Sequence, residues 1–149
     1  MDPHHAHRFE ALDEDRARPW SRYAQWDTPY LAKHLGMQLE EVRAGYARMR
    51  LPGRVENMQP QDIVHGGAIA ALIDTAVVPA IAAFYDHRVA LITLGLNVDY
   101  LDAATSDVVA EAWVAKRGTT TVFCQAEVFE VATETKVATG SLIYRVRAL

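Results

Sequence analysis

The longest apolar segment of the chain is IVHGGAIAALIDTAVVPAIAAFY, which covers residues 63–85. Its length and composition predict a helix over residues 66–85 that is apolar on nearly all sides, and such a helix is enclosed by protein. One carboxylate, Asp74, lies in its middle, and Pro79 follows, where the lost hydrogen bond predicts a kink. A membrane-spanning helix is the alternative, and the alanine-rich composition, the acid and the proline argue against it.

The segments that flank this helix have the pattern of strands. Residues 37–52 can be read with a period of two, which predicts one strand with a bulge at Gly45. After the helix in the sequence, segments rich in Val, Thr and aromatic residues predict four strands, at 90–101, 107–118, 120–131 and 135–148. Their short connections imply antiparallel pairing. We therefore expect an α+β fold in which one curved antiparallel sheet wraps around the long helix.

The segment ahead of residue 37 has little regular pattern. An N-cap residue followed by proline predicts a short helix over residues 29–35. Residues 1–20 are charged, and we expect a mobile terminus there. Metal binding by its histidines is the less favoured alternative, and these are His4, His5 and His7.

Composition limits the classes of function. The chain has 149 residues, of which half are hydrophobic, and this fits one folded domain. The net charge of −4 argues against a nucleic-acid-binding protein, which would carry a basic face. The single cysteine, Cys124, excludes an intrachain disulfide and is expected to be an inert core thiol. Because the N-terminal sequence lacks the apolar core of a signal peptide, we expect a cytoplasmic location.

Two features of the long helix offer chemistry. At Gly66 and Gly67 the backbone N–H groups of the first turn are free, and glycine lets a ligand oxygen approach them, as in an oxyanion site. The alternative is that these glycines only permit tight packing of the helix on the sheet. Asp74 lies in an apolar setting and must be paired, hydrated or protonated. It is either a structural acid satisfied by a nearby hydroxyl or arginine, or a general base or nucleophile.

The spacing of these features bears on the number of subunits. The rise from Gly66 to Asp74 along one helix is about 12 Å. A reacting carbonyl carbon lies within about 3.5 Å of its attacker, while its oxygen lies about 3 Å from the oxyanion donors. One helix cannot place both groups around one carbon. If both act, they come from antiparallel helices of two subunits in a two-fold dimer.

The run HGGAIAALIDTA, followed by strands, resembles the hotdog-fold acyl-CoA thioesterases of the phenylacetate-degradation type. The resemblance covers roughly residues 37–147, which implies a hotdog thioesterase domain at 37–149 and an N-terminal arm with a short helix at 1–36. It implies hydrolysis of an acyl-CoA thioester to a carboxylic acid and coenzyme A. It also implies a homodimer, or a tetramer, that needs no metal or redox cofactor and binds neither nucleic acid nor membrane.

The resemblance implies roles for individual residues. Gly66 donates its N–H to the thioester oxygen, and Asp74 activates a water molecule or attacks the thioester. Asn57, in the loop before the helix, helps to hold the water or the carbonyl group. Thr93, on the strand after the helix, orients the water. His65 completes the family's HGG motif, and it either fixes the loop by hydrogen bonds, which is the favoured role, or transfers protons.

The loop NMQPQDIVHGG departs from the family pattern, because it is longer and lacks the usual glycine. Gln59 or Gln61 is therefore an alternative to Asn57. All three side chains could equally face solvent.

Coenzyme A also requires a site for its phosphates. Arg54, Arg88, Lys116 and Arg117 lie near chain turns, where a dimer could collect them, and a solvated surface is the alternative for each. Lys116 and Arg117 are the best candidates, because the backbone at Gly118 is free to approach a phosphate. Gly67, at the helix start, is a further candidate for binding the substrate.

Two other functions compete with hydrolysis. A non-hydrolytic acyl-CoA-binding protein would share the fold but have an unproductive loop near Asn57. A hotdog dehydratase would need a different arrangement of its acid and histidine. The spacing from HGG to Asp74 fits thioester hydrolysis better.

Overall fold

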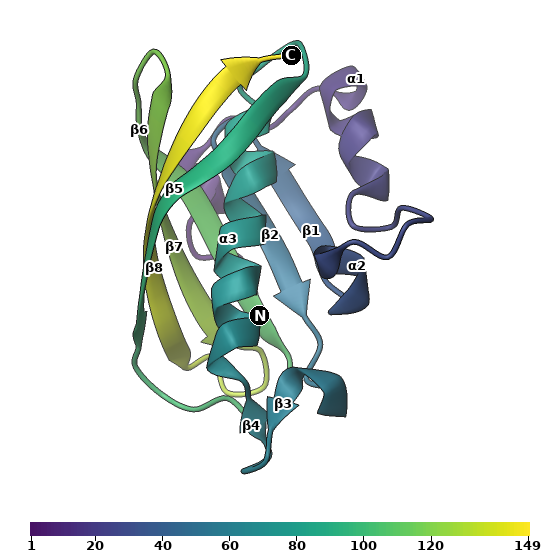
Figure 1. Cartoon of the computed structure of the whole chain (residues 1–149), viewed down its shortest axis with the longest axis vertical. Helices are drawn as coiled ribbons and strands as arrows, with labels where there is room; N and C mark the ends of the chain where they lie inside the picture. The colour runs from purple at the N-terminus through teal and green to yellow at the C-terminus, as the bar shows by residue number, and fades with distance from the viewer.

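Helix α3 (Gly66–Ala82) lies at the centre of the structure, a computed structural model that describes all residues 1–149 (Figure 1). Its apolar side chains are buried on most sides, as the sequence predicts. Pro79 lies inside the helix and is itself buried, and the helix continues to Ala82. No helix in the structure is long and apolar enough to cross a membrane.

A six-stranded antiparallel sheet curves around α3 in the order β1-β2-β6-β7-β8-β5 (Figure 1). The α+β fold expected from the sequence is confirmed, and so are the four strands that follow the helix in the sequence. A separate two-stranded sheet, β3-β4, leads into α3. The strands are β1 (Gln38–Arg43), β2 (Tyr46–Leu51), β3 (Met58–Gln59), β4 (Ile63–Val64), β5 (Val89–Tyr100), β6 (Val108–Arg117), β7 (Thr121–Glu130) and β8 (Lys136–Ala148).

The single strand predicted over residues 37–52 is wrong, because the chain turns back at Gly45 and forms the hairpin β1-β2. Gly45 has a φ of +85°, in the left-handed region that favours glycine. A β-carbon there would also lie 2.6 Å from the ring of Phe84. Arg43 pairs with Tyr46 across the turn, so the inward-facing positions change from even to odd numbers there. A period of two read straight through positions 42, 44 and 46 therefore hid the turn. The bulge itself lies in β1, between Leu39 and Glu41.

The N-terminal arm contains short helices, and the expectation of a mobile terminus is wrong for its first residues. The backbone N–H groups of His4 and His5 donate to the carboxylate of Glu111, at 2.7 and 2.8 Å. Glu111 has no exposed area and also accepts from Arg48 at 3.2 Å, on the sheet face opposite α3. Its charge therefore needs these donors, and they hold the arm. The helices of the arm are η1 (Ala6–Arg8), α1 (Glu14–Ala17), η2 (Arg18–Arg22) and α2 (Leu31–His34), and η3 (Val55–Asn57) follows β2.

The histidines of the N-terminal segment, the less favoured candidates for metal binding, do not gather around one point. The ring of His4 stacks on Phe129 at a centroid distance of 4.4 Å, and His5 Nε2 lies 2.9 Å from a carboxylate oxygen of Glu127. No group of three or more His, Cys, Asp or Glu residues is arranged to hold a metal ion. These histidines instead fasten the arm to the outer face of the sheet.

The contact between α3 and β8 predicts a large cost for a single added methyl group. Gly140→Ala would place a β-carbon 2.7 Å from Ile73 Cγ2, in the interface between helix and sheet. We expect the free energy of unfolding to fall by about 1–3 kcal/mol, because neither neighbour can move freely in a packed core. Urea unfolding measures this change. The matched control is Gly95→Ala, where a β-carbon has no neighbour within 4 Å and the expected change is about 0.5 kcal/mol or less. Equal stability of the two variants would contradict the prediction.

Candidate active site

At the start of α3 the backbone amide of Gly67 is engaged and that of Gly66 is free. His65 is the N-cap residue, and its Nδ1 accepts the N–H of Gly67 at 2.8 Å. That nitrogen is therefore unprotonated. The N–H of Gly66 donates to no acceptor in the chain. Because the helix dipole adds partial positive charge here, Gly66 offers the free donor for a ligand oxygen.

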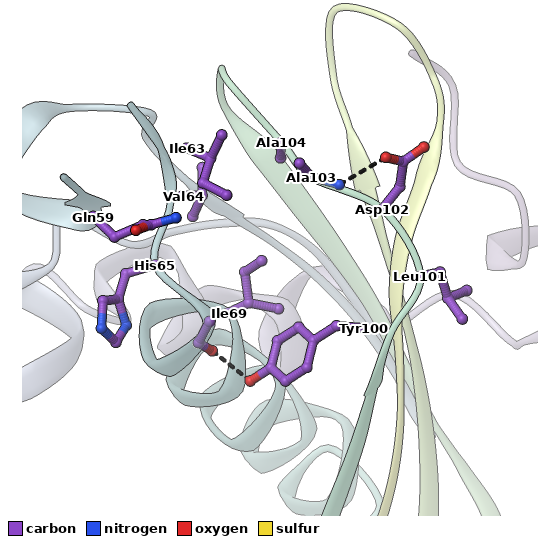
Figure 2. A pocket seen from close by; sticks show the side chains of 11 residues that line it. Gln59, Ile63, Val64, His65, Ile69, Tyr100, Leu101, Asp102, Ala103 and Ala104 are labelled. Atoms are coloured by element: carbon purple, nitrogen blue, oxygen red, sulfur yellow. Dashed lines mark hydrogen bonds between the residues drawn. The ribbon is translucent and has the colours of Figure 1, made fainter. Parts of the chain in front are cut away.

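A pocket of about 460 Å³ opens beside this turn (Figure 2). Tyr100 reaches across it, and its hydroxyl donates to the carbonyl oxygen of Gly66 at 2.6 Å. A β-carbon at Gly66 would lie 3.2 Å from the Tyr100 ring, so the close contact favours glycine. The pocket wall is mostly apolar and contains Gln59, Ile63, Val64, His65, Gly66, Ile69, Tyr100, Leu101, Asp102, Ala103 and Ala104.

One wall of the pocket is the loop after β5, and the carboxylate of Glu130 holds this loop in place. Glu130 is 5% exposed and accepts the backbone N–H groups of Thr105 and Ser106, at 2.7 and 3.1 Å. The hydroxyl of Thr133 donates to its other oxygen at 2.7 Å. These hydrogen bonds, first that of Thr133 and then that of the Thr105 amide, lower the pKa of Glu130 to about 2.

Asp74 is held by hydroxyl groups from two neighbouring strands. Its Oδ1 accepts from Thr93 Oγ1 at 3.0 Å and from the Tyr144 hydroxyl at 2.5 Å. Thr93 on β5 and Tyr144 on β8 face each other across the strand pair. The same Tyr144 hydroxyl lies 2.8 Å from the main-chain carbonyl oxygen of Asp74. No protein group donates to Asp74 Oδ2, so this oxygen is free to act on a ligand.

Tyr144 was not among the residues singled out from the sequence. One signal could have found it, because the alternation of the last strand places Tyr144 on the same face as Leu142 and Val146. A buried phenol normally needs a hydrogen-bond partner, and the acid of the enclosed helix is an obvious one.

The structure thus brings the expected residues together in two separate groups. Gly66 and His65 lie at the pocket, and Asp74 and Thr93 lie further along the helix, outside the pocket lining. The two groups are about 12 Å apart along α3 within one chain.

The Asn57 side chain does not line the pocket. It is 1% exposed, and its Nδ2 donates to the carbonyl oxygens of Leu35 and Pro52 at 2.9 Å each. Its side chain therefore ties the arm to the end of β2. Of the polar candidates in this loop, Gln59 lines the pocket, and its amide donates to Gln61 at 3.1 Å.

The basic residues that are candidates for binding the coenzyme A phosphates lie at the end of the fold opposite the pocket, near the C-terminal end of α3 (Figure 1). The Arg117 guanidinium stacks over the ring of Phe84 at 4.8 Å. Gly118 closes the β6-β7 hairpin, and its N–H donates to Thr121 O at 2.8 Å, so this amide is not free for a phosphate. Arg88 lies just ahead of β5, and Lys116 is the penultimate residue of β6.

Comparison with known proteins identifies the family of this chain. The sequence profile of the thioesterase superfamily matches residues 61–136, which include the glycine pair and Asp74. A candidate esterase from Halobacterium salinarum is 35% identical over 126 residues, covering 78% of this chain and 83% of that protein. The chain therefore belongs to the thioesterase superfamily of hydrolases.

Solved structures share its hotdog fold. A thioesterase from Haemophilus influenzae superposes with a TM-score of 0.81 at 19% identity, covering 95% of each chain. The PaaI protein from the phenylacetic acid degradation operon of Escherichia coli superposes with a TM-score of 0.77 at 20% identity, covering 90% of this chain and 95% of that one. The resemblance drawn from the HGG run is confirmed at the level of family and fold.

The hydrogen bonds of Glu130 predict a pH-dependent contribution to stability. Because its pKa is lowered from 4.5 to about 2 in the folded protein, ionised Glu130 stabilises the fold above pH 4.5. That contribution is lost as the pH falls from 4.5 towards 2. We expect Glu130→Gln to be about 1–2 kcal/mol less stable at pH 7, because a carboxylate that accepts several hydrogen bonds is replaced. The difference from wild type should shrink towards pH 3 in urea unfolding.

The control for this prediction is Glu134→Gln, which changes an exposed glutamate four residues away. Its stability should follow the wild-type curve at every pH. A constant difference between Glu130→Gln and wild type from pH 7 to pH 3 would contradict the role of the ionised carboxylate.

Proposed function

We propose that the protein hydrolyses an acyl-CoA thioester to a carboxylic acid and free coenzyme A. The observation that carries this proposal is the presence, on one helix, of an unused N-terminal amide at Gly66 and of a carboxylate, Asp74, with one oxygen restrained and the other free. The Gly66 amide can bind the oxygen of a thioester, and the free oxygen of Asp74 can act as a base or a nucleophile.

The spacing of these groups favours a site shared between two subunits. A two-fold axis beside α3 would place Asp74 of one subunit near Gly66 of the other. Strand β5 supports such a dimer, since it is an edge of the sheet with exposed apolar side chains. Ile92, Leu94, Leu96 and Tyr100 on this strand are between 40% and 52% exposed. We propose a homodimer as the smallest active unit, and a tetramer would contain two of them.

Hydrolysis can follow two routes in this site. In the first, Asp74 Oδ2 takes a proton from a water molecule, which attacks the thioester carbon, and Thr93 helps to orient that water. In the second, Oδ2 attacks the carbon itself and water then cleaves the resulting anhydride. In both routes the Gly66 N–H stabilises the negative charge on the thioester oxygen, the C–S bond breaks and the coenzyme A thiolate takes up a proton.

Supporting residues have distinct roles in this proposal. His65 caps the helix, keeping the Gly67 amide occupied and the Gly66 amide free. Asn57 holds the loop, and Gln59 is the polar side chain of that loop that can reach the substrate. In an antiparallel dimer, Arg88, Lys116 and Arg117 of one subunit would lie towards the pocket of the other, where coenzyme A phosphates need cations.

The lining of the pocket favours a neutral acyl group. Its side chains are mostly apolar and include no lysine or arginine. The one carboxylate in the lining, Asp102, disfavours an acyl chain that ends in a second carboxylate. We propose that residues 37–149 form this thioesterase domain, that residues 1–36 form its arm, and that the protein works in the cytoplasm, where its buried thiol Cys124 stays reduced.

A non-hydrolytic acyl-CoA-binding protein is the second candidate. The burial of Asn57 favours it, because the family's polar loop residue then does not face the substrate. Binding without turnover would support this alternative.

Turnover should depend on Asp74. We expect wild type to release thiol from acyl-CoAs, with neutral medium-length or aromatic acyl groups preferred over succinyl-CoA. Asp74→Asn should lower kcat/KM by at least about 100-fold, because the base or nucleophile is removed. The assay follows free thiol, and Asp86→Asn, an exposed acid beyond the same helix, is the control. Binding of acyl-CoA with no thiol release by wild type would overturn the proposal.

The shared site predicts that two inactive variants restore each other. Gly66→Pro removes the amide. Proline suits the backbone of the first helical position after His65, which is extended, and the Tyr100 ring must shift by a few tenths of an ångström to admit the added atoms. A heterodimer of Gly66→Pro and Asp74→Asn contains one intact site, so equal mixing should recover about a quarter of wild-type activity. Activity after unfolding and refolding the mixture measures this. Heterodimers seen by native mass spectrometry without recovered activity would rule out a shared site.

A further inference from the structure

The environment of Tyr144 connects the acid to the C-terminal strand. Tyr144 is 2% exposed on β8, and its ring lies in the main hydrophobic core. Its hydroxyl reaches both Asp74 Oδ1 and the main-chain carbonyl oxygen of Asp74, at 2.5 and 2.8 Å. A single rigid side chain therefore contacts the carboxylate and the backbone of the same residue.

We propose that Tyr144 is a positioning residue for Asp74, holding Oδ1 against the sheet so that Oδ2 is the oxygen that reacts. This inference rests on the proposed function for the reactive role of Asp74, and on the geometry alone for the contact. Thr93 donates to the same Oδ1 from the neighbouring strand, so two donors fix one oxygen and none holds the other.

A tyrosine suits this task better than a flexible polar side chain. A phenol has few rotatable bonds, and packing in the core fixes its ring. Burial, and then the hydrogen bond with Asp74, raise the pKa of Tyr144, so it stays a protonated donor at neutral pH. A donor to the ionised form favours the carboxylate over the carboxylic acid.

Two other titratable side chains lie near this contact. Tyr23 from the arm has a raised pKa, because of burial and then the charge of Asp74. Cys124 on β7 has a pKa raised to about 12 by burial. Neither changes its charge near neutral pH, so neither contributes to the acidic limb of the activity profile.

The test is the pH profile of Tyr144→Phe in the thiol-release assay. We expect kcat to fall about 10–100-fold with KM changed less than about threefold, because orientation is lost after the substrate binds. The acidic limb of the kcat profile should move to higher pH, because the carboxylate has lost a hydrogen-bond donor. Tyr46→Phe, which changes a buried tyrosine on the opposite sheet face, should leave the limb unmoved. A fall in kcat without a shift of the acidic limb would mean that Tyr144 acts only through packing, and this result would overturn the proposal.

A second readout does not require turnover. In protein labelled with ¹³C at aspartate carboxyl groups, the Asp74 signal, assigned by its loss in Asp74→Asn, should titrate at higher pH in Tyr144→Phe than in wild type. Inactive wild type with this shift intact would refute the proposed function and keep the positioning contact. Identical titration in both proteins would refute the contact, whatever the activity.

A gentler change at the same position covers the case in which Tyr144→Phe does not fold. 3-Fluorotyrosine introduced at position 144 keeps the ring and makes the hydroxyl a stronger donor. The Asp74 titration should then move to lower pH. Thr93→Val should act in the same direction as Tyr144→Phe, and Thr93→Ser, which keeps the hydroxyl, should restore wild-type behaviour. A titration that does not respond to fluorination would overturn the proposal.

Discussion

The fold depends on the sheet enclosing helix α3, which has almost no polar face. Helix α3 is shielded from water only if the sheet backbone packs closely against it. Gly140 on β8 allows this close packing against Ile73. Every polar group on the enclosed helix must then find its partner in the sheet or the loops. Asp74 finds two hydroxyl donors there, and both bind the same oxygen, Oδ1.

Most of the fold could be predicted from the sequence because hydrophobic pattern and chain order sufficed. A continuous apolar helix followed by four strands with short connections admits few packings. The hairpin at Gly45 was missed because positions 42, 44 and 46 can be read with a period of two, although the turn reverses the alternation. The docked N-terminus was missed for a different reason: the donors to buried Glu111 are backbone amides of His4 and His5, and amides carry no sequence signal.

The candidate site was partly predictable for the same physical reasons. Gly66 and Asp74 stand out because glycine and acid are rare in an apolar helix, and Thr93 followed from the family pattern. Tyr144 did not stand out in the sequence. Its place beside Thr93 and Asp74 depends on the pairing of β5 with β8 and on a contact with the helix, and these segments are distant in the sequence. Asn57 has the expected residue type, but its amide is taken by Leu35 and Pro52, and only the three-dimensional packing of the arm reveals that.

The pairing of β5 with the last strand has a consequence for biosynthesis. During synthesis β5 emerges well before β8, and β8 is its only partner within the chain. Until β8 leaves the ribosome, the apolar residues of β5 have no neighbouring strand, and this interval is open to aggregation or chaperone binding. Because β8 also brings Tyr144 to Asp74, this carboxylate acquires both of its hydroxyl donors only when β8 has folded.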